Sequence, residues 1–202
     1  MDVVARVTRA LERHPAITAV RLVGSRQRGA AGDLSDWDFE VDTADFAAVA
    51  GDLPALVSPL RPLAQQWDRL SRRATYMLIL RGAVKIDLLF DRPHELEPPW
   101  KVSAETLQAI DSHFWDWILW IASKQCAGKH QLVEEEFTKM SSHLLRPMGV
   151  ERIPDTIETA ITLYTSARRE LENRLGVVVP KGLEQEIRGA LRESGCCPDG
   201  VP

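Results

Sequence analysis

Residues 20–41 read VRLVGSRQRGAAGDLSDWDFEV, and this stretch decides the fold. It opens with a β-branched and apolar run, which predicts a strand over 18–23 that ends at Gly24-Ser25. A loop containing Gly29 and Gly32 follows, and the pattern predicts a second strand over 38–41. The stretch is therefore two strands joined by a glycine-containing loop.

The turn at Gly24-Ser25 has the chemistry of a phosphate-binding turn. Glycine lets the backbone come close to a phosphate, since it has no side chain to stand between them. We expect a short helix after the turn, where the Ser25 hydroxyl and exposed N–H groups could donate to phosphate oxygens. Taken alone, a strand that ends at a Gly-Ser turn is a common structural feature.

Two aspartates follow, Asp36 and Asp38, on either side of Trp37. On a strand, residues i and i+2 point to the same face, so the two carboxylates would project together. Convergent carboxylates are costly unless a cation neutralises them, and oxygen ligands suit magnesium. Trp37 should point the other way, into the core.

A third carboxylate, Asp87, lies within the apolar run Lys85-Ile86-Asp87-Leu88-Leu89-Phe90. Ile86 and Leu88 would face the core, so Asp87 would face the opposite side together with Lys85 and Leu89. A carboxylate in so apolar a strand needs a reason to be there, and metal binding supplies one.

Outward from these motifs, the first ninety or so residues mix helical and strand patterns. Helical spacing predicts helices over 4–11 and 46–57, and apolar runs predict strands over 74–80 and 83–90 with a tight turn at Arg81-Gly82. Proline residues between Pro93 and Trp100 predict a linker. Beyond it, helical stripes predict four helices over 107–121, 133–144, 157–171 and 183–191, the third introduced by Asp155 as N-cap. We therefore expect an α+β domain over 1–95, with a mixed sheet and flanking helices, and a helical bundle over 101–195.

Composition narrows the function classes. The net charge of −4 argues against a broad basic field for duplex nucleic acid. No apolar run approaches the roughly 20 residues of a membrane span, and no signal peptide is recognisable, so we expect a cytoplasmic protein. Three cysteines, two of them adjacent at Cys196 and Cys197, do not form the framework of a disulfide-stabilised domain.

The strand, Gly-Ser turn, Asp-x-Asp strand and later single aspartate together resemble the DNA polymerase beta-like nucleotidyltransferase superfamily. Among its members, the motif is similar to the small bacterial aminoglycoside and lincosamide nucleotidyltransferases and to the minimal enzymes of toxin–antitoxin pairs. The resemblance implies that Gly24 and Ser25 grip a nucleoside triphosphate. It implies that Asp36 and Asp38 bind two magnesium ions and that Asp87 binds the ion beside the attacking hydroxyl.

The resemblance also implies a reaction, the transfer of AMP from ATP to a hydroxyl of a small-molecule acceptor with release of pyrophosphate. Arg26 and Arg28 lie where they could contact the triphosphate, but the sequence is equally consistent with two solvated surface arginines. The acceptor would bind in a cleft between the two domains.

Several features of the sequence leave the acceptor site and the function open. Tryptophans of the first bundle helix, Asp116 and Glu134–Glu136 could line an acceptor pocket, but core packing and solvated faces are the simpler interpretations. Two other functions stay open, a toxin–antitoxin enzyme that modifies a partner protein or RNA and an inactive nucleotide-binding relative. The acceptor, the base preference and the oligomeric state, a homodimer included, are not specified by the sequence.

Overall fold

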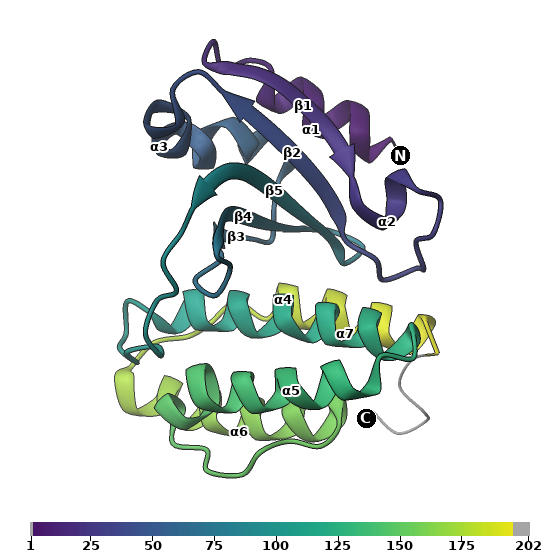
Figure 1. The fold of residues 1–202 in the computed structure, drawn as a ribbon. Coiled ribbons are helices and arrows are strands. Elements are labelled where there is room, and N and C mark those ends of the chain that lie inside the picture. The colour runs from purple at the N-terminus through teal and green to yellow at the C-terminus, as the bar shows by residue number, and fades with distance from the viewer. Residues whose placement is uncertain (1, 196–202) are drawn as a thin grey trace. The chain divides into compact units, whose positions relative to one another are not determined.

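A computed structural model describes residues 2–195 of the chain. The chain divides into two compact units, one of residues 1–31 with 35–97 and one of residues 32–34 with 98 onward (Figure 1). The adjacent Cys196 and Cys197 lie outside the described residues. Cys126 is disulfide-bonded, which the sequence analysis did not anticipate.

The first unit is a five-stranded mixed sheet with helices packed on one face (Figure 1). Its strands are β1 (Ile17–Val23), β2 (Trp37–Thr43), β3 (Ala64–Trp67), β4 (Arg73–Leu80) and β5 (Val84–Pro93), and its helices are α1 (Val3–Leu11), α2 (Gly24–Gln27), α3 (Phe46–Val57) and the 3-10 turn η1 (Ser58–Leu60). The strand order is β1-β2-β5-β4-β3. The β2–β5 pair is parallel and the other pairs are antiparallel, so the sheet is mixed, as the sequence predicts.

Alternating side chains of the central strands build the core of this unit. Phe39 and Val41 of β2 and Leu88 of β5 are buried against Val7 of α1 and Leu53 of α3. The same alternation turns Asp38 and Asp87 to the face opposite this core, because neighbouring residues of a strand point to opposite faces. The core packing therefore fixes which face of the sheet carries the carboxylates.

Two features of the sheet differ most from the sequence prediction. The edge strand β3 was not predicted, since Gln65 and Gln66 interrupt its apolar pattern and only its backbone pairing with β4 shows it to be a strand. Strand β5 continues to Pro93, where the sequence predicted the start of the linker. The main chain of Arg73 is in register with Pro93, which extends the pairing past Phe90.

The second unit is a helical bundle, as predicted (Figure 1). It consists of α4 (Leu107–Cys126), α5 (His130–Met140), the π-helical turn η2 (Ser141–Leu145), the 3-10 turn η3 (Arg146–Met148), α6 (Ile157–Leu175) and α7 (Gly182–Glu193). Helix α4 packs against α5, α6 and α7. None of the described helices combines the length and the apolar character that crossing a membrane requires.

A buried polar network joins three of these helices. Asp111 of α4 accepts hydrogen bonds from Trp115 Nε1 at 3.2 Å, Tyr164 Oη at 2.7 Å and Arg168 Nη1 at 2.8 Å. Arg168 also donates to Glu184 of α7 at 2.5 Å. Burial raises the pKa of the Asp111 carboxyl, against the lowering effect of the Tyr164 and Arg168 hydrogen bonds. These bonds connect α4, α6 and α7 through charged groups that would be costly to bury without partners.

Some polar residues of the bundle differ from the sequence prediction. Glu136 is buried and accepts a hydrogen bond from Trp117 Nε1 at 2.9 Å, because a buried indole N–H needs an acceptor. Asp116, also expected on a solvated face, is half-buried. The N-cap of α6 is Thr156 rather than Asp155, since the Thr156 side chain accepts from the amide of Thr159 at 3.1 Å.

Candidate active site

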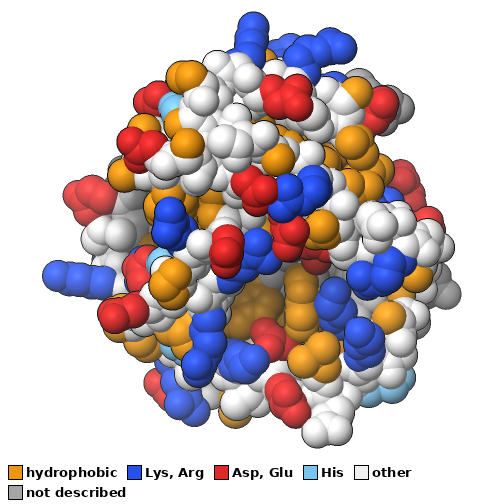
Figure 2. All heavy atoms as spheres, turned by 45° about the horizontal axis from the view of Figure 1, so that its top comes forward, with side chains coloured by type: hydrophobic (Ala, Val, Ile, Leu, Met, Phe, Trp, Pro, Cys, Tyr) orange, Lys and Arg blue, Asp and Glu red, His pale blue; other side chains and the backbone are white. Residues whose placement is uncertain are grey.

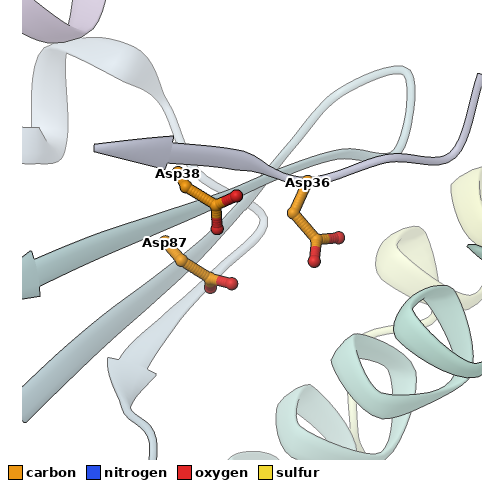
Figure 3. A group of neighbouring side chains, drawn as sticks. All are labelled: Asp36, Asp38 and Asp87. Atoms are coloured by element: carbon orange, nitrogen blue, oxygen red, sulfur yellow. The ribbon is translucent and has the colours of Figure 1, made fainter. Parts of the chain in front are cut away.

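Three carboxylates converge at one end of the β2–β5 pair (Figure 3). Asp38 of β2 is directly in register with Asp87 of β5. The sequence analysis treated Asp36 and Asp38 as residues of one strand, but Asp36 comes immediately before β2. Its carboxylate nevertheless turns to the same place. One oxygen from each of the three lies within 4.8 Å of the others. The parallel pairing of two strands thus unites residues that are far apart in the sequence.

The donor set fits a divalent metal ion. Opposite ligands of magnesium lie about 4.2 Å apart, twice the metal–oxygen distance of about 2.1 Å. Oxygen atoms within 4.8 Å need little movement to reach that spacing. Asp36 is 8% exposed, and an ionised carboxylate so buried beside two others is costly without a cation.

A lysine lies against this group. Lys85 Nζ donates to Asp87 Oδ1 at 2.6 Å and to Asp87 Oδ2 at 2.8 Å. The Lys85 side chain is only 5% exposed, and that of Asp87 is 14% exposed. The sequence placed Lys85 on the same face as Asp87 through strand alternation, but it assigned Lys85 no part in the site.

Gly24 brings backbone directly against the carboxylate of Asp38. Its φ of +75° lies in the left-handed region, which residues with a side chain rarely adopt. A Cβ added to Gly24 would lie 2.1 Å from Asp38 Oδ2, far inside van der Waals contact. Glycine is therefore required here for two reasons, the backbone conformation and the space that Asp38 occupies.

The predicted short helix after this turn is α2, which contains Ser25 and Arg26. The half-buried Ser25 stays close to Gly24, and its carbonyl accepts from the amide of Ala30 at 2.9 Å, which closes the turn. Arg28 is exposed at the end of α2. The proposed contacts of Ser25 and Arg28 with phosphate stay predictions.

Arg26 makes contacts that the sequence did not reveal. Its Nε and Nη2 donate to the carbonyl of Ser35 at 3.0 and 2.6 Å. Its guanidinium also lies over the ring of Trp37, 4.2 Å from the centroid, while Trp37 packs against the core as expected. Arg26 thereby connects α2 to the segment that carries Asp36, and its contact with a triphosphate stays a prediction.

The chain is distantly similar to solved structures, one of which is an adenyltransferase. The crystal structure of an aminoglycoside 6-adenyltransferase from Bacillus subtilis aligns over 96% of this chain and 97% of that chain, with 10% sequence identity and a TM-score of 0.35. No family model and no curated protein matches the chain. Similarity this low carries no information about activity, so the function must be inferred from the residues of the site.

Proposed function

We propose that this chain is a magnesium-dependent nucleotidyltransferase. It would transfer AMP from ATP to a hydroxyl of a small-molecule acceptor and release pyrophosphate. The observation that carries the proposal is the convergence of Asp36, Asp38 and Asp87 beside the Gly24 backbone. This arrangement supports the roles that the sequence resemblance implies for these residues.

The three carboxylates would bind metal at two positions. Asp36 and Asp38 would bind the metal that accompanies the triphosphate, and Asp87 would bind at the acceptor side. Bound there, magnesium neutralises charge on the phosphates and makes the acceptor hydroxyl easier to deprotonate. Asp38 and Asp87 come from two paired strands of one sheet, so the backbone pairing holds their spacing, and Asp36 joins them from the residue before β2.

The Gly24-Ser25 turn would position the triphosphate. The missing side chain at Gly24 lets the turn lie directly against the Asp38 carboxylate. A phosphate held by the turn would therefore lie beside a metal ion that Asp38 binds. In the reaction, the acceptor oxygen forms a bond to the α-phosphorus as the bond from that phosphorus to the pyrophosphate oxygen breaks. The acceptor proton leaves to a base, for which Asp87 is the candidate.

The surface is compatible with a small acceptor. Acidic and basic side chains are interspersed on the face that Figure 2 shows, without a broad field of one sign. Together with the net charge of −4, this favours a small molecule over duplex nucleic acid. We also propose that residues 1–95 act as the nucleotidyltransferase domain and residues 101–195 as a separate helical domain.

A screen for pyrophosphate release tests the proposal. The purified chain is incubated with magnesium, each nucleoside triphosphate in turn and pooled hydroxyl-bearing acceptors, including aminoglycosides and lincosamides. We expect pyrophosphate with ATP and at least one pool, and a product heavier than its acceptor by one adenylyl group in mass spectrometry. The Asp38→Asn variant is the control and should be inactive. Product formation by that variant at the wild-type rate would contradict the assigned site.

A further inference from the structure

Lys85 places a positive charge inside the proposed metal site. The residue lies two positions before Asp87 on β5, so both side chains point to the same face. Its ammonium donates to both oxygens of the Asp87 carboxylate, at 2.6 and 2.8 Å. A lysine that is 5% exposed is far more buried than most lysines, and the pairing with Asp87 offsets the cost of that burial.

The charges of these four groups suggest what Lys85 does. Three ionised carboxylates carry a formal charge of −3, and Lys85 reduces the sum to −2. One divalent cation balances this charge, whereas a second would leave an excess of two positive charges until a triphosphate arrives. Lys85 therefore makes the site electrostatically complete with a single divalent ion.

Geometry leads to the same conclusion. A second ion bound at Asp87 would have to share carboxylate oxygens that already accept from Lys85. It would also stand close to the ammonium, in a partly buried place where like charges repel strongly. Lys85 thus opposes a cation at Asp87 both by occupying its oxygens and by its charge.

We propose that Lys85 is a built-in counter-cation that limits the nucleotide-free site to one divalent ion. It is a positioning residue, which acts through Asp87. The inference rests on the proposed function, because it requires that the three carboxylates bind metal. It adds that this chain carries within its own sequence a charge that opposes metal at Asp87 before nucleotide binds.

Manganese binding to the full chain, without nucleotide, tests the proposal. Electron paramagnetic resonance measures the free ion in a titration and so gives the number bound per chain. We expect one Mn²⁺ for the wild type and for Lys85→Arg, which keeps the charge, and two for Lys85→Met. Lys101→Met removes the same charge at an exposed position and should bind one ion.

Melting temperatures provide a second measurement. Lys85→Met leaves three carboxylates without their internal cation, so we expect it to melt lower than the wild type in chelator and to gain more from Mn²⁺. If Lys85→Met does not fold, the double variant Lys85→Met/Asp87→Asn restores the formal charge of −2, and Lys85→Gln keeps a hydrogen-bond donor. We expect the double variant to fold and bind one ion, and Lys85→Gln to bind two.

The outcomes separate the two proposals. Two ions on the wild type, or one ion on Lys85→Met or Lys85→Gln with wild-type affinity, would overturn the role of Lys85 and leave the metal site intact. Absence of Mn²⁺ binding by the wild type and by every Lys85 variant would instead contradict the metal site on which the proposed function depends.

Discussion

Gly24→Ala is the substitution that tests the architecture of the site most specifically. The new methyl group would lie 2.1 Å from Asp38 Oδ2 and 3.0 Å from Asp38 Cγ. Ordinary contact needs about 3.5 Å, so the carboxylate or the turn would have to move by roughly 1 Å or more. A displacement of about 1 Å at a reacting centre can reduce turnover on the order of a hundredfold.

A second glycine of the same loop provides the matched control. Gly29 has a φ of +68°, close to the +75° of Gly24, but an added Cβ would meet no atom within 4 Å. Alanine at either position therefore carries the left-handed backbone cost of roughly 1–2 kcal/mol. Only Gly24→Ala also displaces Asp38, so the difference between the two variants isolates the contact with the carboxylate.

Calorimetric titration with magnesium–ATP measures the nucleotide affinity of the two variants. Pyrophosphate release measures their turnover once an acceptor is known. We expect Gly29→Ala to bind ATP and turn over like the wild type apart from a lower melting temperature. Gly24→Ala should lose most of its nucleotide affinity and on the order of a hundredfold in turnover. If Gly24→Ala and Gly29→Ala matched each other in affinity and rate, the close approach of Gly24 to Asp38 would have no functional meaning.

Two further substitutions test other parts of the account. Asp87→Asn should lower turnover on the order of a hundredfold or more while magnesium–ATP affinity stays within several-fold, because Asp87 would act at the acceptor side in the transition state; unchanged turnover would make Asp87 a structural residue. In the bundle, burial alone would raise the pKa of Glu184, but hydrogen bonds and charges from Arg168 and Arg188 outweigh it and hold that pKa below its ordinary value. A lowered carboxyl pKa contributes stability above the ordinary value of about 4.3, and this stability is lost as the pH falls through the folded-state pKa. In urea unfolding, Glu184→Gln should therefore be less stable than the wild type at pH 7 and should lose less stability between about pH 5 and pH 3. Glu170→Gln, on the exposed face of α6, is the control and should follow the wild type. Parallel pH profiles for all three proteins would refute the assignment.

Much of the fold follows from local patterns in the sequence. Alternation along 84–90 places Asp87 opposite the core, and the Gly-Ser turn marks the end of β1. The helical spacing of Val4, Val7 and Leu11 likewise predicts α1. These features depend on residues close in the chain, which is why the sequence alone suffices for them.

Features that depend on the three-dimensional path of the chain were not predictable in the same way. The Lys85–Asp87 pairing needs the ammonium to be enclosed, and strand alternation shows only that the two residues share a face. The bonds of Arg26 to the Ser35 carbonyl depend on the path of the loop between them. Asp111 lies within an apolar helix, and its partners Tyr164 and Arg168 follow more than fifty positions later, at separations of 53 and 57 residues.

The most direct test of the central claim is calorimetric titration of ATP into the wild-type chain with magnesium and with chelator. If Asp36, Asp38 and Asp87 form a metal-dependent nucleotide site, ATP should bind with magnesium and much more weakly with chelator. Asp36→Asn and Asp38→Asn should show the weak binding in both conditions. Equal affinity of the wild-type chain for ATP with magnesium and with chelator would contradict the account.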